Sequence, residues 1–269
     1  MPETFFLADG DRFIPTELTR GPWDPRAQHG GPPAALLGRA VEGHGERAGM
    51  SVARATFEFL RPVPIAPLEL ATTLLRGGRN VELVGASLAS QGTEVMRVVA
   101  LRIRTTRLDL PDSGPPPAGA GVPPGPEQGR PLPFFPTGFD VGYHTAMQWR
   151  FIEGSFMEPG PGTVWLRMRC PLLPGEEPSP LQRVFIAADS GNGVSGVLDW
   201  RRWLFINCDL TVYLQRSPVG EWVCLQARTT VDGAGMGLAE SVISDLQGPV
   251  ARGLQSLFVA ERAGGAGSG

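Results

Sequence analysis

Lysine is absent from this chain of 269 residues, so all 24 of its basic side chains are arginines. Acidic residues outnumber them, which gives a formal net charge of −3 and an isoelectric point near 5.7. Proteins that bind nucleic acids rely on a surplus of basic side chains along the phosphate backbone. Since this chain has no such surplus, we expect no nucleic acid partner.

Cysteine and histidine are scarce. The cysteines are odd in number, and their spacing fits neither a disulfide framework nor a zinc site: Cys170, Cys208 and Cys224. The histidines form no closely spaced pair and no H-E-x-x-H motif: His29, His44 and His144. We therefore expect a reducing, cytoplasmic compartment and no metal or other cofactor.

Long apolar runs are missing as well. No stretch approaches the roughly 18 residues of a membrane-spanning helix, and the start MPETFFLADGDRF lacks the basic segment of a signal peptide. We expect neither export nor a membrane span. The 42% apolar and 19% charged residues are instead typical of a folded globular protein.

Proline and glycine concentrate in residues 111–137, PDSGPPPAGAGVPPGPEQGRPLPFFPT. A helix or strand ladder does not run through such a segment, because proline lacks the N–H donor and glycine lacks conformational restraint. We interpret it as a linker between an N-terminal unit, residues 1–110, and a C-terminal unit, residues 138–263. Residues 264–269 are expected to form a flexible tail.

Each unit contains one predicted helix followed by a run of strands. In the first unit the helix follows Pro32 and Pro33, which the first turn tolerates. In the second unit, Ser179 caps the start of a helix with an apolar stripe, and glycines from position 191 on end that helix. β-Branched and aromatic segments separated by turn signals predict the strands: 51–62, 68–77, 81–90 and 94–106, then 203–218, 221–231, 236–246 and 250–260.

Local sequence details repeat between the two units. The matched positions are Arg61 and Arg216, Gln91 and Gln247, and Arg97 and Arg252, separated by 155, 156 and 155 positions. A period this long indicates a duplicated domain rather than a solenoid. Because one helix and one antiparallel sheet leave a sheet face that a single unit cannot cover, we expect the units to pair, with a cleft between them.

The stretch PTELTRGPWDPRAQHGGPPAALLGRAVE, followed by ATFEFLRPVPI, resembles the N-terminal domain of the acyl-CoA thioesterase II-like (TesB-like) family. The second unit is similar to that family's C-terminal domain. The resemblance implies an α+β double hotdog fold, in which two tandem units each wrap a long helix in an antiparallel sheet. It also implies hydrolysis of a fatty acyl-CoA to free acid and CoA by an Asp-activated water, without a cofactor. Acyl-CoA is then the expected partner, and a homo-oligomer is compatible with the sequence.

The resemblance also implies catalytic positions. The family uses an Asp on the second hotdog helix, a Gln on the last strand and a Thr on the strand after the helix. The Asp corresponds to Asp189 and the Gln to Gln255, whereas Asn207 stands where the family has Thr. The counterparts of these positions in the first unit, 155 residues earlier, are Ala34, Val52 and Ala100. None of these side chains can transfer a proton, so the candidate chemistry belongs to the second unit.

The residues themselves leave alternatives open. Asp189 follows a helix C-terminus and apolar neighbours, which both disfavour its negative charge and so favour proton uptake from water. The alternatives are a solvated residue at the helix end or a plain helix cap and, as a mechanism, direct attack of Asp189 on the thioester to form an anhydride. Gln255 lies on an apolar strand face and needs either a catalytic water or a backbone partner. Strict alternation predicts that Asn207 is an exposed amide opposite the apolar row of its strand: Leu204, Ile206, Cys208 and Leu210.

His29, Gly30 and Gly31 mark the start of the first helix. Free amide donors at a helix N-terminus can bind a carbonyl or phosphate oxygen, which makes these residues a candidate substrate-binding site. An ordinary turn and cap is the alternative.

Two other functions stay open. A hotdog hydratase needs an Asp and a His together, and the second unit contributes only His144, well before its helix, which disfavours this function. A non-catalytic acyl-thioester binding module is favoured by the Thr-to-Asn departure at Asn207. The glycine pattern of residues 191–196 follows a capped helix rather than a strand, which argues against a dinucleotide site.

Overall fold

The computed structural model describes residues 3–46, 49–111 and 121–262. The expected tail, 264–269, and residues 112–120 of the expected linker lie outside the described residues. Within them, no helix is long and apolar enough to cross a membrane.

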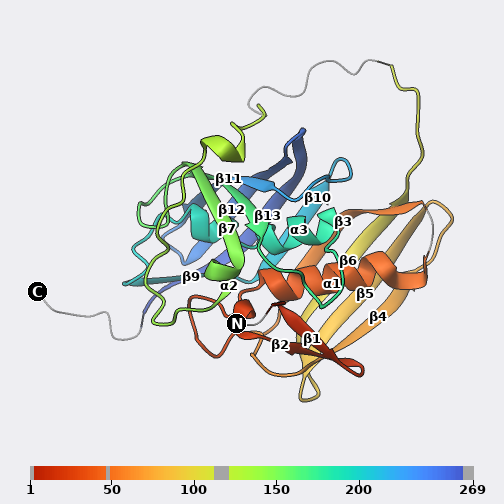
Figure 1. Cartoon of the computed structure of the whole chain (residues 1–269), viewed down its shortest axis with the longest axis horizontal. Coiled ribbons are helices and arrows are strands. Elements are labelled where there is room, and N and C mark those ends of the chain that lie inside the picture. Colours follow the sequence, from red (N-terminus) through yellow and green to blue (C-terminus); the bar gives the residue numbers. More distant parts are fainter. Residues whose placement is uncertain (1–2, 47–48, 112–120, 263–269) are drawn as a thin grey trace, which may run out of the picture.

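Two halves of the chain have the same order of elements (Figure 1). The first contains β1 (Phe6–Asp9), β2 (Arg12–Pro15), α1 (Gly31–Gly43), β3 (Met50–Phe59), β4 (Leu68–Arg76), β5 (Val81–Ser90) and β6 (Thr93–Arg104). After the short helix α2 (Tyr143–Ala146), the second contains β7 (Met147–Glu153), β8 (Gly162–Met168), α3 (Pro180–Ala188), α4 (Gly191–Val194), β9 (Trp203–Asn207), β10 (Asp209–Leu214), β11 (Val223–Val231), β12 (Met236–Asp245) and β13 (Gly248–Glu261). The predicted helices and strands are confirmed, except that the one strand expected over 203–218 is divided into β9 and β10. The strand pair that precedes each helix was not predicted.

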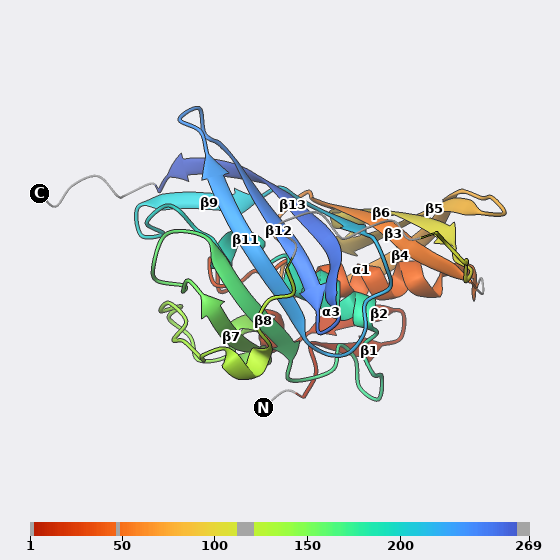
Figure 2. The same ribbon diagram turned by 90° about the horizontal axis from the view of Figure 1, so that it is seen from above.

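All strands belong to one antiparallel sheet. Its order is β1-β2-β4-β5-β6-β3 in the first half, continued by β10-β13-β12-β11-β8-β7 in the second, with β9 also paired to β13. The second sequence is the first in reverse, so the halves are related by a pseudo-two-fold axis at the β3–β10 pair. There, Thr56 lies opposite Thr211. The sheet covers one side of both helices, as Figure 2 shows. The duplication predicted from the repeated positions is thus a repeated topology.

The two helices pack against each other in antiparallel orientation. Gly38 of α1 lies where a β-carbon would be 2.5 Å from the Phe185 ring of α3. A β-carbon on Gly31 would collide with the backbone oxygen of Ile186. These close approaches require glycine, and they place the first turn of α1 beside the last turn of α3. Both helices contribute to one hydrophobic core that spans the two halves.

At the opposite corner, the end of α1 meets the start of α3. The Oε2 atom of Glu42 accepts hydrogen bonds from Ser179 Oγ (2.6 Å) and Gln182 Nε2 (3.2 Å), while Ser179 caps α3 by accepting from the Gln182 amide. Burial raises the pKa of the Glu42 carboxyl above its ordinary value of 4.5, against the opposing effect of both hydrogen bonds. The folded state therefore binds this proton more tightly than the unfolded state does.

Because the pKa of Glu42 is higher in the folded state than in the unfolded state, its bound proton stabilises the fold. This stabilisation is fully present at pH values below the unfolded-state pKa. That contribution is lost as the pH rises through the folded pKa, at about 1.4 kcal/mol per pKa unit. We expect Glu42→Gln to lack this loss. Thermal unfolding should show similar Tm values at about pH 4 and a Tm about 2–4 °C higher for the variant at about pH 7. A Tm difference that does not grow with pH would contradict this assignment.

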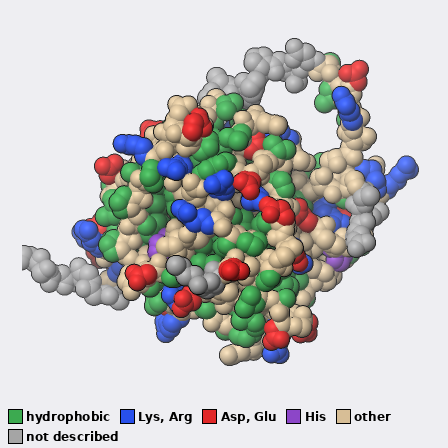
Figure 3. All heavy atoms as spheres, viewed as in Figure 1, with side chains coloured by type: hydrophobic (Ala, Val, Ile, Leu, Met, Phe, Trp, Pro, Cys, Tyr) green, Lys and Arg blue, Asp and Glu red, His purple; other side chains and the backbone are tan. Residues whose placement is uncertain are grey.

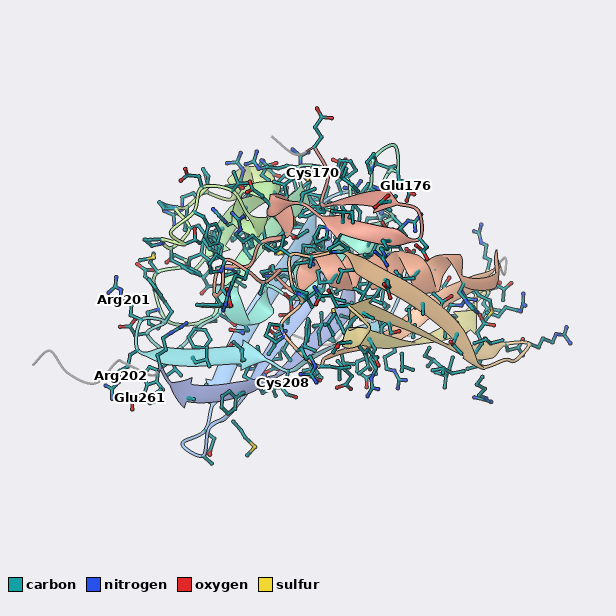
Figure 4. All side chains as sticks on the ribbon, turned by 90° about the horizontal axis from the view of Figure 1, so that it is seen from below. Cys170, Glu176, Arg201, Arg202, Cys208 and Glu261 are labelled. Carbon is teal, nitrogen blue, oxygen red and sulfur yellow. The ribbon has the colours of Figure 1, made fainter. Side chains whose placement is uncertain are left out.

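Charged and hydrophobic side chains are interspersed on the face seen in Figure 3, without a dominant charge of one sign. Arg202 and Glu261, near the end of β13, form an exposed ion pair of 2.8 Å. Figure 4 shows them at the lower left of the molecule, whereas Glu176 lies at the top, right of the centre. The same view places Cys170 and Cys208 on opposite sides, and all three cysteines are free thiols.

Candidate active site

Asp189 and His29 meet across the two halves. Asp189 is the residue at which α3 ends, and its Oδ2 atom lies 2.9 Å from Nδ1 of His29, just before α1. The side chains are 4% and 14% exposed. The antiparallel helix pair brings them together, although 160 positions separate them in the sequence. The expectation that no histidine lies near Asp189 is therefore wrong, because it considered only the second unit.

The same nitrogen of His29 has a second neighbour. The backbone N–H of Gly31 points to Nδ1 at 3.0 Å. Nδ1 can accept that bond only when it carries no proton, and it can donate to the Asp189 carboxylate only when it carries one. The two contacts therefore compete, and a single proton placed between Oδ2 and Nδ1 decides which is made. This arrangement lets a proton pass between Asp189 and His29.

Tyr143 fixes the His29 ring. The two rings stack with centroids 3.7 Å apart and an interplanar angle of 13°. The phenol O–H donates to the Ile186 carbonyl (2.8 Å) and lies 3.0 Å from Ser190 Oγ. Complete burial raises the pKa of Tyr143 far above its usual value, so the hydroxyl stays neutral and acts as a donor. Sequence reasoning missed Tyr143, because nothing local connects α2 with α1 or α3.

Asn207 donates from Nδ2 to Oδ1 of Asp189 at 2.8 Å. The prediction that Asn207 is an exposed amide is wrong, because its side chain lies on the inner face of the sheet. Asn207 pairs with Leu257 and Val212 pairs with Gly253, both on the inner face of β13. An unbroken strand could not present positions 207 and 212 on one face, so the interruption at Cys208 between β9 and β10 shifts the alternation by one residue.

Gln255 stabilises the turn that contains Asp189 through two hydrogen bonds. Its Nε2 donates to the Asp189 carbonyl (3.2 Å), and its Oε1 accepts from the Asn192 amide (3.0 Å). The side chain is 2% exposed. Both the nitrogen and the oxygen of the Gln255 amide thus bind backbone groups in this structure. The sequence had left open whether the partner is a backbone group or a catalytic water.

Gly30 and Gly31 allow the close approach of the helices. A β-carbon at Gly30 would lie 2.5 Å from the Phe59 ring and 2.8 Å from Asp189 Oδ2. The amide of Gly31 is directed at His29, whereas the amide of Gly30 has no hydrogen-bond partner within the described ranges. Gly30 N–H is thus a free donor next to the carboxylate, at the positive end of the α1 dipole.

A cavity of about 530 Å³ lies beside these residues, and the predicted site residues Gly31 and Gln255 lie outside its wall. His29, Gly30, Asp189 and Asn207 all contribute to its wall. One end is formed by aromatic side chains that come mainly from segments outside the predicted helices: Trp23, Phe134, Phe135, Tyr143, Trp149 and Phe156. The other end contains Phe59 to Val63 and Cys208, and includes the exposed Arg61. Among the described residues, no three His, Cys, Asp or Glu side chains cluster as a metal site would require.

Part of the expected linker belongs to this cavity. Phe134 and Phe135 stack on each other at 4.4 Å, and Phe135 also stacks on Trp23 at 5.4 Å. Composition alone described residues 111–137 as a spacer. The FF pair among prolines was the signal that this segment packs against something.

Comparisons with known proteins agree with this architecture. The model of the acyl-CoA thioesterase N-terminal domain matches residues 19–103, and that of the C-terminal domain matches residues 126–259. No curated protein matches the chain.

Among solved structures, a candidate thioesterase II from Thermobifida fusca is 20% identical, with 96% of each chain covered and a TM-score of 0.74. A hot dog fold protein of unknown function from Alicyclobacillus acidocaldarius is 18% identical over 96% of each chain, with a TM-score of 0.69. The acyl-CoA thioesterase II TesB2 from Mycobacterium marinum is 16% identical over 95% of this chain and 94% of its own, with a TM-score of 0.64. This chain therefore has the double hotdog fold and belongs to the TesB-like acyl-CoA thioesterase family.

Proposed function

We propose that the protein hydrolyses acyl-CoA thioesters to the free acid and CoA, with Asp189 as the general base. The observation that carries this proposal is the buried Asp189–His29 contact in the cavity wall, 2.9 Å long, in a chain of the thioesterase family. Release of free thiol from a panel of acyl-CoAs tests it directly. A protein that binds acyl-CoA without releasing thiol would instead be a binding module.

The proposed reaction begins with proton transfer from water to Asp189. Each carboxylate oxygen has lone pairs beyond the one used by Asn207 or His29, so the base can still accept from a water. The hydroxide oxygen adds to the thioester carbonyl carbon while the C=O π electrons move to the oxygen. Collapse of this intermediate breaks the C–S bond. The proton held between Asp189 and His29 returns to the departing CoA thiolate, so atoms and charges balance.

The free N–H of Gly30 is the donor proposed for the developing oxyanion. Preorganised backbone donors of this kind stabilise a tetrahedral intermediate by about 3–4 kcal/mol. Asn207 and Gln255 are positioning residues in this proposal. Asn207 orients the carboxylate through Oδ1, and Gln255 fixes the backbone at Asp189 and Asn192.

Hydration of a 2-enoyl thioester is the second candidate, because the contact between His29 and Asp189 supplies the pair that such chemistry needs. The products distinguish the two reactions. Hydrolysis releases a thiol from saturated and unsaturated substrates alike. Hydration consumes the conjugated double bond, retains the thioester and leaves a saturated substrate untouched.

Arg61 is proposed to bind an anionic group of the CoA arm. Its counterpart Arg216 makes a bidentate ion pair with Asp245, the last residue of β12. The corresponding end of β5 carries Ser90, since both residues precede a two-residue turn to the next strand. No partner for the Arg61 guanidinium exists in the described parts of the chain, and it lines the exposed end of the cavity.

We expect Arg61→Ala to raise KM for an acyl-CoA about fivefold, because an exposed ion pair contributes about 1 kcal/mol to binding. The KM for the matching acyl-pantetheine, which lacks the nucleotide phosphates, should not change. Steady-state kinetics with both substrates provide the measurement. Arg79→Ala is the matched control, because Arg79 is exposed in the turn between β4 and β5, away from the cavity. An equal rise for both substrates would contradict phosphate binding by Arg61.

A further inference from the structure

The aromatic end of the cavity is its less exposed end, although Trp23, Phe134 and Trp149 are only half-buried. Tyr143, Phe135 and Phe156 are 1%, 6% and 9% exposed, whereas Arg61 and Cys208 at the other end are exposed. Asp189 and Gly30 lie between them, because Tyr143 stacks on the His29 ring and Phe59 lies against Gly30. A thioester whose carbonyl reaches Gly30 would thus direct its charged CoA arm past Arg61 and its acyl group among the rings.

The rings form a continuous series that starts at the catalytic pair. From Tyr143 the series continues to Trp149 (5.9 Å, 83°) and from there to Phe156 (5.0 Å, 79°). Phe156 lies 4.4 Å from Phe134, which stacks on Phe135. These mutual contacts join the rings into one packed aromatic cluster that lines the cavity. Aromatic groups prefer offset-stacked and edge-to-face neighbours at such separations.

Hydrogen bonds hold two of these rings in place. Trp149 donates from Nε1 to the His144 carbonyl at 3.0 Å, and the Tyr143 hydroxyl is bound to α3. A flat acyl group would meet rings that are already oriented, so little side-chain entropy is lost when it binds. A long alkyl chain needs an open channel beyond the first few carbons. Here the bulky side chains of Trp23, Phe135 and Phe156 lie at the junction between this cavity and a neighbouring one of about 280 Å³.

We infer that this site selects thioesters of aromatic acyl groups, such as arylacetic acids, in place of the long fatty chain that the family resemblance implies. This inference rests on the proposed function, since it assigns the acyl group to the buried side of Asp189. The phenyl ring packs against the cavity side of the cluster formed by Phe134, Trp149 and Phe156. The rings at the junction of the two cavities limit the length of the acyl group.

The test compares acyl groups with equal numbers of carbon atoms: phenylacetyl-CoA, cyclohexylacetyl-CoA and octanoyl-CoA, with palmitoyl-CoA as the long chain. We expect kcat/KM for phenylacetyl-CoA to exceed that of the two matched substrates about tenfold, the effect of one or two favourable ring contacts. Palmitoyl-CoA should be the poorest. The cyclohexyl substrate separates ring stacking from size and shape. Equal values for the phenyl and cyclohexyl substrates, or a preference for octanoyl or palmitoyl, would overturn the inference.

Phe134→Leu keeps an apolar side chain and removes one ring. This variant should bring the phenyl-to-cyclohexyl ratio of kcat/KM close to one. The matched control is Phe139→Leu, in the same segment but outside the cavity wall. If Phe134→Leu leaves the ratio unchanged while thermal unfolding shows a folded protein, the rings do not select the acyl group.

Binding of thioether analogues separates this inference from the proposed function. In these probes a methylene group lies between sulfur and carbonyl, so they cannot be hydrolysed. Failure to hydrolyse every thioester would reject the proposed function alone. Quenching of tryptophan fluorescence would then still rank the phenyl against the cyclohexyl analogue. A tenfold tighter phenyl analogue supports an aromatic acyl site, and equal affinity rejects it.

Discussion

Asp189→Asn is expected to lower kcat for acyl-CoA hydrolysis by about 10²–10⁴, the usual contribution of a positioned general base. The amide cannot accept a proton from water. It can keep the local structure, because its oxygen still accepts from Asn207 Nδ2 and its N–H₂ can donate to His29 Nδ1 in the unprotonated state. Steady-state release of free thiol measures the effect, and an unchanged Tm shows that the loss is chemical.

The control for this change is Asp11→Asn, an exposed aspartate in the turn between β1 and β2. It should retain full activity. If the Asp189→Asn protein hydrolyses acyl-CoA as fast as the parent, Asp189 is not the base. If the parent itself binds acyl-CoA without turnover, the protein is a binding module.

His29→Phe is expected to lower kcat about 10²-fold or more while KM changes little. The phenyl ring preserves the stack on Tyr143 and removes the nitrogen that contacts Asp189. The Asp189 carboxylate then retains Asn207 as its side-chain partner but lacks the second one. A buried group deprived of a partner costs about 1–3 kcal/mol, so a lower Tm is also expected.

The double variant Asp189→Asn/His29→Phe tests whether the two residues act as one unit. Its kcat should be no lower than that of the poorer single variant, because residues that share one proton lose their effect together. Multiplicative losses would show that His29 and Asp189 act independently. His44→Phe is the control histidine, since His44 contacts Thr72 on the sheet and not the cavity.

Sequence patterns predicted much of the fold for physical reasons. These patterns are local signals, and local backbone preferences alone are enough to turn them into helices and strands. They include the helical spacing before Gly43, the Ser179 cap, and the alternating segments of β3 to β6 and β11 to β13. The strand pair before α1 escaped prediction because β1 and β2 are only four residues long. Asn207 was placed on the wrong face because an interruption at Cys208 leaves no mark in the alternation.

The site depended on contacts that no local pattern contains. Asp189 and Gln255 were identified from the sequence, but the role of His29 beside Asp189 arises only when α1 and α3 pack in antiparallel orientation. The aromatic end of the cavity likewise joins a loop, a proline-rich segment, α2 and the β7–β8 region. The duplicated topology and the positions of the glycines were thus determined by the sequence alone. The tertiary structure decided which side chains of the two unequal halves meet beside Asp189 and which rings line the cavity, because these contacts join residues far apart in the chain.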